Sequence, residues 1–289
     1  MNTKNKKKKL SIGFIGAGNM AEAMIAALIR TGAFPPDHIL AGDVNPQRSE
    51  YMEKTYGIKR VDHNRDIVAA CRIVVFAVKP QQMADLLKDL SASGAFDAIM
   101  DRLLVISIAA GVHLETFEKA LYAGKTETER QRIPIVRVMP NTPALVGAGM
   151  CAFSTNCHAT GDDIDITRRI LGAMGEVIHC DESKMDAVTA VSGSGPAYCF
   201  YFIESIIEAG EKLGLTPEEA FQLTVSTVKG ALRLMEVQGE SPAALRRKVT
   251  SPGGTTEAAL RVFEENRLRE KLIAAVASAA RRAQELGQS

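Results

Sequence analysis

Residues 10–24 have the sequence LSIGFIGAGNMAEAM, which predicts a buried strand, a glycine turn and the start of a helix. Gly16, Gly18 and Ala21 fall in the G-x-G-x-x-A spacing of a dinucleotide-binding turn. Gly16 permits the tight turn, Gly18 lets the backbone approach a pyrophosphate, and Ala21 lets the helix pack closely on the strand. A helix that begins near Asn19 would present free N–H groups and its positive dipole end to the phosphates.

The residues after this turn are typical of the same kind of site. An apolar strand is expected at residues 39–41, and Asp43 follows it about 20 residues beyond the turn, where a carboxylate can bind the hydroxyls of a ribose. Asp43 would repel the 2′-phosphate of NADP. Arg48, one turn into the next helix, and Asn45, at its cap, are candidates to bind that phosphate. These opposing features leave the choice between NADH and NADPH open.

Strands and helices alternate through the first part of the chain, which predicts an α/β fold with a doubly wound parallel sheet of the Rossmann type. Ligands bind such sheets at the carboxyl ends of the strands, where small residues and prolines gather here. The further strands are expected at residues 72–78, 103–108, 133–139, 150–154 and 176–180. The turns expected to form one cleft are residues 16–20, 77–80, 107–111 and 140–143.

From about residue 181 the pattern becomes purely helical, which indicates a second domain. Its helices could form a bundle alone, but they are apolar on most faces, and such helices more often pack against a second subunit, so we expect a homodimer. The expected helices are residues 194–213, residues 216–237, one opening at Ser241, one opening at Thr255 or Thr256, and residues 268–286. The expected organisation is therefore a basic tail (1–9), a nucleotide-binding Rossmann domain (10–180) and an all-α dimerisation domain (181–289).

Composition excludes several classes of function. The 35 basic and 34 acidic residues give a net charge of +1, and tryptophan is absent, so we expect no nucleic-acid partner. No long uncharged apolar run or export signal is found, and the five cysteines are scattered, so we expect a cytoplasmic protein without a membrane segment. The five histidines never fall at ligand spacing, so we expect no metal site.

Several short motifs occur together in one order along the chain. They are GFIGAGNMA (13–21), AVKP (77–80), AAG (109–111), RVMPNTP (137–143), DAVT (186–189), SGSGPAY (192–198) and VTSPGGTT (249–256). With these motifs the chain resembles the pyrroline-5-carboxylate reductase family, from about Leu10 to the C-terminus. The pair SGSGPAY and SPGGTT is the most specific part of the resemblance, whereas the lysine-rich tail and residues 124–132 lie outside it.

The resemblance implies hydride transfer from NADPH, with NADH also plausible, to 1-pyrroline-5-carboxylate, which gives L-proline in the last step of proline biosynthesis. It also implies a homodimer with interlocked helical domains, and in larger relatives five such dimers form a decameric ring. The implied cofactor contacts are Ile15, Gly16, Ala17, Gly18, Asn19, Met20, Asp43, Asn64, Ala77, Val78, Lys79, Pro80, Ile108, Ala109 and Ala110.

The implied substrate loop is residues 249–256, with contacts at Val249, Ser251, Gly253, Gly254, Thr255 and Thr256. Two glycines before a helix would expose successive backbone N–H groups to the substrate carboxylate. The Thr256 hydroxyl is the candidate catalytic group, because it can hydrogen-bond the ring nitrogen; its alternative role is an N-cap. Lys79 is expected to line the site without donating a proton.

Two other functions fit parts of the chain. A β-hydroxyacid dehydrogenase-like oxidoreductase would need a catalytic lysine on the helix at residues 194–213, where only Lys212 occurs, near its end. A non-catalytic nucleotide sensor would be expected to lose the substrate loop, which is intact here.

Overall fold

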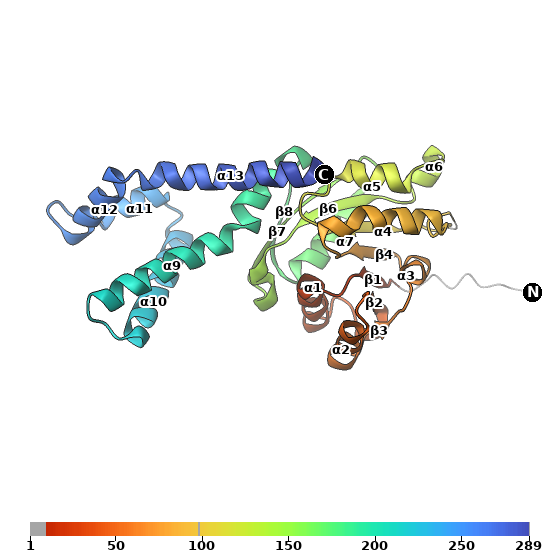
Figure 1. The fold of residues 1–289 in the computed structure, drawn as a ribbon, viewed down its shortest axis with the longest axis horizontal. Helices are drawn as coiled ribbons and strands as arrows, with labels where there is room; N and C mark the ends of the chain where they lie inside the picture. Colours follow the sequence, from red (N-terminus) through yellow and green to blue (C-terminus); the bar gives the residue numbers. More distant parts are fainter. Residues whose placement is uncertain (1–9, 98, 289) are drawn as a thin grey trace, which may run out of the picture. The chain divides into compact units, whose positions relative to one another are not determined.

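The computed structural model describes residues 10–97 and 99–288 and divides them into two compact units (Figure 1). The first unit ends at Gly193 and takes up the chain again at Ala279; the second spans Ser194–Ser278. The expected basic tail, residues 1–9, lies outside the described residues.

The first unit is built on an eight-stranded sheet in the order β3-β2-β1-β4-β5-β6-β7-β8. The strands are β1 (Ile12–Ile15), β2 (Ile39–Gly42), β3 (Lys59–Arg60), β4 (Ile73–Phe76), β5 (Leu104–Ser107), β6 (Ile135–Met139), β7 (Gly149–Thr155) and β8 (Gly175–His179). The expected Rossmann-type sheet is therefore present, and each strand predicted from the sequence is found.

The expectation of a wholly parallel sheet is wrong for the last two strands. β7 pairs antiparallel with β6, and β8 pairs parallel with β7, so both run against the first six strands. A parallel pair needs a crossover connection of about a dozen or more residues, usually a helix. Only the short 3-10 turn η2 (Thr142–Val146) joins β6 to β7, so the chain turns back directly.

Helices cover both faces of this sheet, and side chains alternate between two apolar clusters along the central strands β1, β4, β5 and β6. Phe14 of β1 packs in the cluster that contains Met24 of α1, whereas Ile15 packs in the cluster that contains Met83 of α4 and Phe117 of α5. The helices of this unit are α1 (Asn19–Arg30), α2 (Pro46–Tyr56), α3 (Asn64–Ala70), α4 (Pro80–Ala92), α5 (Leu114–Leu121), α6 (Glu127–Arg130), α7 (Gly161–Gly172) and α8 (Met185–Val188). Burial on both faces explains why the central strands β1, β4 and β5 are nearly continuous apolar runs.

Local capping signals fix most helix ends as the sequence predicts. The Asn45 side chain accepts a hydrogen bond from the Gln47 N–H at the start of α2, and Gly57 ends that helix in the left-handed conformation. α3 begins at Asn64, and His63 precedes it at the cap position without a side-chain cap hydrogen bond. The solvated stretch 124–132 contains α6, which a Thr126–Glu129 capping box stabilises.

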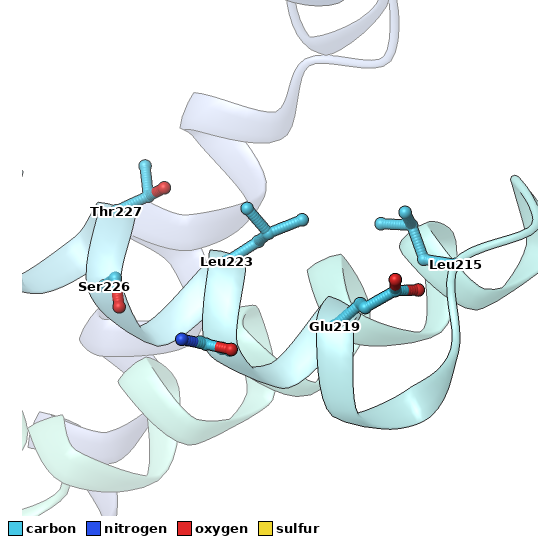
Figure 2. A pocket seen from close by; sticks show the side chains of 6 residues that line it. Leu215, Glu219, Leu223, Ser226 and Thr227 are labelled. Carbon is cyan, nitrogen blue, oxygen red and sulfur yellow. The ribbon is translucent and has the colours of Figure 1, made fainter.

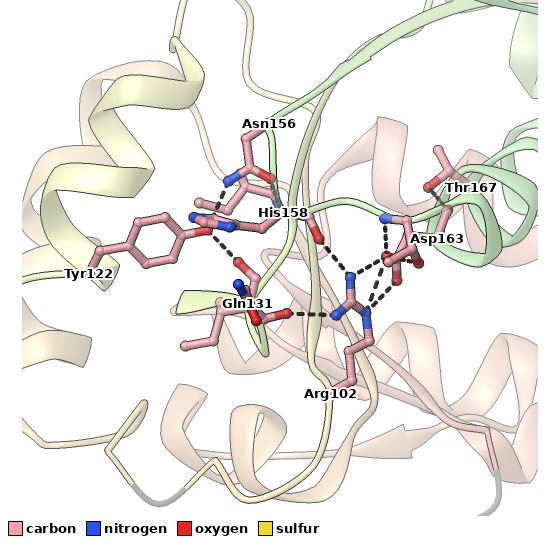
Figure 3. Close-up of polar contacts among 10 residues, drawn as sticks. Arg102, Tyr122, Gln131, Asn156, His158, Asp163 and Thr167 are labelled. Carbon is pink, nitrogen blue, oxygen red and sulfur yellow. Dashed lines mark hydrogen bonds and ion pairs between the residues drawn. The ribbon is translucent and has the colours of Figure 1, made fainter. Parts of the chain in front are cut away.

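A polar network lies at the amino ends of β5 and β6 (Figure 3). The guanidinium of Arg102 donates to the Asp163 carboxylate (Nε to Oδ1, 3.1 Å) and to the carbonyls of Gln131 (2.6 Å) and His158 (2.7 Å). Burial acts to raise the pKa of Asp163, but the hydrogen bonds from Arg102 and Thr160 outweigh it, so the pKa lies below its usual value. This network ties three connections together and leaves the carboxyl ends of the parallel strands for ligands.

A buried arginine joins two of the motifs seen in the sequence. Arg137, in RVMPNTP, donates to Asp186 of DAVT at 3.0 Å and to Glu182 at 3.3 Å, and its side chain is 3% exposed. Asn141 reaches Ser192 in the π-helical segment Thr189–Gly193 (Nδ2 to O, 3.3 Å). The sequence places the domain boundary at residues 180–181, whereas these contacts keep the chain with the sheet as far as Gly193.

The second unit is helical, as expected. Its helices are α9 (Gly195–Lys212), α10 (Pro217–Gln238), α11 (Pro242–Lys248), α12 (Thr255–Glu265) and the first part of α13 (Leu268–Gln288). A capping box of Thr216 and Glu219 opens α10, and the Ser241 side chain caps α11. Among the described residues, no helix is long and apolar enough to cross a membrane.

Large apolar side chains of the second unit stay exposed. Phe200 is 65% exposed, Tyr201 69% and Phe221 58%. An open cavity of about 690 Å³ is lined by Leu215, Glu219, Gln222, Leu223, Ser226 and Thr227. Figure 2 shows that these side chains come from α10 and the turn that precedes it. An apolar surface of this kind marks an interaction site.

Candidate functional site

The carboxyl end of β1 lies at the switch point of the sheet. β2 lies on one side of β1 and β4 on the other, so the connection that leaves β1 toward β2 and the one that leaves β4 toward β5 run in opposite directions. Ligands bind open α/β sheets at this point. A cavity of about 520 Å³ opens there, lined by Ile15, Gly16, Gly18, Gly42, Asp43, Val44, Asn64, Ala77, Val78, Lys79, Gln81, Gln82, Asp85, Leu86 and Asp89.

The two glycines of the turn have different surroundings. Gly16 has φ +94°, and a Cβ there would lie 2.9 Å from the carbonyl carbon and oxygen of Ala77, so only glycine fits. The Gly16 N–H also donates to the Gly42 carbonyl at 2.8 Å. Gly18 precedes α1 as its N-cap residue and has open space where a Cβ would stand. The turn is thus sterically fixed at Gly16 and open at Gly18.

Asp43 lines the cavity and also supports the glycine turn. Its Oδ2 accepts a hydrogen bond from the Ala17 N–H at 2.8 Å, and its Oδ1 accepts one from the Asn45 N–H at 2.9 Å. Each carboxylate oxygen can accept a second bond, so these contacts leave capacity for ribose hydroxyls.

The sequence made Arg48 a candidate to bind the 2′-phosphate, but its side chain already has other partners. Its Nε donates to the Ala17 carbonyl at 2.6 Å, and its Nη2 binds the Glu22 carboxylate. Both backbone polar groups of Ala17 are therefore hydrogen-bonded, the N–H to Asp43 and the carbonyl to Arg48.

The predicted cofactor residues fall into two groups. Those that line the cavity are Ile15, Gly16, Gly18, Asp43, Asn64, Ala77, Val78 and Lys79. Those outside its lining are the buried Ala17, the first residues of α1 (Asn19 and Met20), the first residue of α4 (Pro80), and the residues after β5 (Ile108, Ala109 and Ala110). Lys79 is exposed and forms no ion pair within the described part of the chain.

Sequence reasoning missed one wall of the cavity, which α4 provides. Gln81, Gln82, Asp85, Leu86 and Asp89 all line it. The spacing of Gln81, Asp85 and Asp89 places them on one face of a helix. Because this face directly follows the predicted turn at residues 77–80, the helical spacing of these side chains could have indicated that α4 lines the cavity. Gly42 and Val44, which flank Asp43, were also missed.

In the second unit, the predicted substrate loop is a tight turn that leads into α12. Pro252 and Gly253, with φ +73° at Gly253, occupy the middle of a turn closed by the Gly254 N–H, which donates to the Ser251 carbonyl at 3.0 Å. The Gly253 N–H donates to the Glu257 carboxylate at 2.7 Å. Val249 follows α11 as its C-cap residue, and both Val249 and Ser251 are exposed.

Thr256 is not an N-cap. α12 begins at Thr255 and Gly254 occupies the cap position, so Thr256 is the second helical residue. Its hydroxyl forms no hydrogen bond with any described residue, and the residue is half-buried. The first N–H groups of a helix, here those of Thr255 and Thr256, have no partner within the helix. The start of α12 thus offers uncommitted donors to an anion.

A switch-point cavity with a glycine turn is typical of dinucleotide-binding proteins, and comparison with known proteins places the chain among the oxidoreductases. Residues 11–111 match the family described as NADP oxidoreductase coenzyme F420-dependent, and residues 182–286 match pyrroline-5-carboxylate reductase dimerisation. The chain is 40% identical to pyrroline-5-carboxylate reductase of Synechocystis sp., over 96% of this chain and 99% of the relative. It is 38% identical to that of Pseudomonas aeruginosa, over 96% and 97%. The chain belongs to the pyrroline-5-carboxylate reductase family.

Solved structures give the same result. The pyrroline-5-carboxylate reductase of Coxiella burnetii is 37% identical and superposes with a TM-score of 0.83, covering 97% of this chain and 99% of that one. The Plasmodium falciparum enzyme, solved with NADP bound, is 28% identical with a TM-score of 0.84 over the same shares. The resemblance inferred from the motifs is confirmed, as are the α/β class and the helical dimerisation region.

Proposed function

We propose that this chain reduces 1-pyrroline-5-carboxylate to L-proline with NADPH or NADH, using the switch-point cavity for the dinucleotide and residues 249–256 for the substrate. The observation that carries the proposal is the similarity to reductases of this name over 96% of the chain, which includes both glycine loops. The residues present fit a dinucleotide, because Gly18 lines the cavity, has open space where a Cβ would stand and occupies the N-cap position of α1, and a helix N-terminus favours an anion.

When bound, the reduced nicotinamide supplies the hydride. The chain's own residues must hold the substrate carboxylate, orient the ring and hydrogen-bond its nitrogen, because a protonated imine accepts a hydride far better than a neutral one. We assign the carboxylate to the N–H groups of Thr255 and Thr256 and the ring nitrogen to the Thr256 hydroxyl. Ser251, Gly253 and Gly254 shape the loop that presents these donors.

For the cofactor, we propose that both NADPH and NADH are used and that Asp43 narrows the advantage of NADPH. The Asp43 carboxylate lines the cavity at the end of β2, where an adenosine ribose binds in this fold. A carboxylate there accepts bonds from both ribose hydroxyls but repels a 2′-phosphate.

We propose a homodimer formed through the second unit, with five dimers in a ring as the larger assembly to test, in a cytoplasmic enzyme. The match to the dimerisation family and the exposed Phe200, Tyr201 and Phe221 support self-association. Light scattering should give at least twice the 31.1 kDa mass of the chain, and a monomeric mass at micromolar concentration would contradict the proposal.

The decisive experiment follows the absorbance of NADPH and of NADH with purified protein. Oxidation should require pyrroline-5-carboxylate, yield proline and continue in the presence of a chelator. Activity that a chelator abolishes and zinc restores would overturn the proposal. Oxidation of β-hydroxyacids in the reverse direction would favour the alternative dehydrogenase, and binding of nucleotide without any turnover would favour a sensor.

A further inference from the structure

The only basic side chain bound to the glycine turn within the described residues is Arg48, and it is committed to a carboxylate. Its Nη2 binds Glu22 Oε2, from the first turn of α1, while its Nε binds the Ala17 carbonyl at 2.6 Å. The guanidinium also lies over the Tyr51 ring, 5.1 Å from its centroid. The side chains of Arg48 and Glu22 are 24% and 19% exposed, so the pair is partly shielded from water.

The same guanidinium lies close to the ribose end of the cavity. The Ala17 carbonyl accepts from Arg48, and the Ala17 N–H donates to Asp43, which lines the cavity. One residue therefore separates the cation from the carboxylate that faces the ribose. Arginine is the side chain best suited to bind a phosphate, because it presents several N–H donors in a rigid plane. A guanidinium released from Glu22 would therefore be a phosphate-binding cation one residue away from the Asp43 carboxylate.

Glu22 is itself held in place. Its Oε1 accepts hydrogen bonds from the hydroxyls of Tyr56, at 2.8 Å, and Tyr51, at 3.0 Å. Burial acts to raise the pKa of Glu22, but the bonds from Arg48, Tyr56 and Tyr51 lower it below its usual value, so the carboxylate is ionised at neutral pH. Burial and the bond to Glu22 raise the pKa of Tyr56 to about 12, so it stays a neutral donor.

We propose that Glu22 is a specificity-determining residue: by binding Arg48 it withholds that cation from the 2′-phosphate and so shifts selectivity toward NADH. Removing Arg48 from this pair would leave a partly buried carboxylate without its counter-charge, which is costly. Together with Asp43, Glu22 makes the ribose end of the cavity unfavourable for a phosphate. The inference rests on the proposed use of a nicotinamide dinucleotide, but not on the identity of the substrate.

The test compares Glu22→Gln with wild type and with Glu50→Gln. The first variant keeps a side-chain oxygen for Tyr51 and Tyr56 but removes the charge that holds Arg48. Glu50 is the matched control, because it pairs with Lys54 on the exposed face of α2. Affinities for 2′,5′-ADP and for 5′-ADP are measured by calorimetry, and kcat/KM is measured for both cofactors. Two ratios should rise about 5- to 30-fold in Glu22→Gln: the affinity for 2′,5′-ADP over that for 5′-ADP, and kcat/KM for NADPH over that for NADH. Both ratios should stay unchanged in Glu50→Gln.

Arg48→Ala supplies a second test on an independent variant. Because Arg48 does not contact the phosphate in the wild type, this variant should weaken both cofactors equally by loosening the turn, and it should abolish the effect of Glu22→Gln in the double variant. An unchanged ratio in folded Glu22→Gln overturns the proposal. A selective loss of NADPH in Arg48→Ala also overturns it, since Arg48 would then already bind the phosphate. Calorimetry with the two ADP compounds reports on this site even if pyrroline-5-carboxylate proves not to be the substrate.

Discussion

The chain carries two glycine loops that each lead into a helix, and the two are supported in different ways. In the sheet unit, the Ala17 N–H binds the carboxylate of Asp43, which comes from the next strand connection. In the helical unit, the Gly253 N–H binds the carboxylate of Glu257, four residues further along the same loop and helix. Both loops therefore use a carboxylate of the chain itself to orient their N–H groups.

The two loops differ in the sequence separation of the residues that contact them. Around Gly16 the turn is fixed by contacts with Ala77, directly after β4, and with Gly42, the last residue of β2, and Ala17 is fully buried. Around Gly253 the contacts are local, with the Ser251–Gly254 turn and Glu257 on α12, and the residues are exposed. The nucleotide turn is thus preformed by the fold, whereas the substrate loop depends on its own short-range bonds.

The largest effect is expected from Gly16→Ala. A Cβ at φ +94°, 2.9 Å from the Ala77 backbone, should cost about 2–4 kcal/mol of unfolding free energy and abolish NADPH binding. Thermal unfolding and calorimetry measure the two effects. Gly18→Ala is the matched control, because its Cβ meets open space: it should keep the melting temperature and lose only affinity for the nucleotide. Equal stability of both variants would show that the turn is not locked by the fold.

Thr256→Val comes next. Loss of one positioned donor should lower kcat about 10- to 1000-fold, with KM for the cofactor little changed. Steady-state kinetics at saturating cofactor measure this, and Thr256→Ser, which keeps the hydroxyl, should recover most of the rate. A valine variant with near wild-type turnover would leave Thr256 without a catalytic role.

Asp43→Ser should raise kcat/KM for NADPH by about 1–2 kcal/mol, roughly 5- to 30-fold, relative to NADH. The variant also removes the acceptor of the Ala17 N–H, so both cofactors should lose some affinity in common. The cofactor ratio separates the two effects. Asp37→Ser, an exposed carboxylate outside the cavity lining, serves as control. No change in the ratio would place the 2′-hydroxyl beyond the reach of Asp43.

The smallest effect is expected at the substrate loop. Glu257→Ala removes a single exposed hydrogen bond, so KM for pyrroline-5-carboxylate should rise only about 3- to 10-fold, with kcat nearly constant. Glu257→Gln keeps an acceptor for the Gly253 N–H and should behave as wild type. If KM instead fell in both variants, Glu257 would compete with the substrate carboxylate rather than support the loop.

Much of the fold and part of the site follow from local sequence. The strand positions, the cap at Asn45, the capping box at Thr216 and the glycine spacing at Gly16 and Gly18 each depend on residues within a few positions of one another. Such signals can be recognised without knowing the rest of the fold. The motifs that identify the family are local in the same sense.

Only the tertiary structure decided the features that join distant residues. β7 and β8 run against the other strands, and the Arg137–Asp186 ion pair holds residues 186–189 against the sheet. Side chains of α4 form one wall of the switch-point cavity. Arg48 forms an ion pair with Glu22, so it is not free to bind a phosphate. Strand direction depends on how a connection packs, and the partner of a charged side chain depends on which opposite charge the fold brings nearest. By itself, the sequence predicted a dinucleotide turn and a substrate loop; the contacts across the sheet determined which charges remain free to bind.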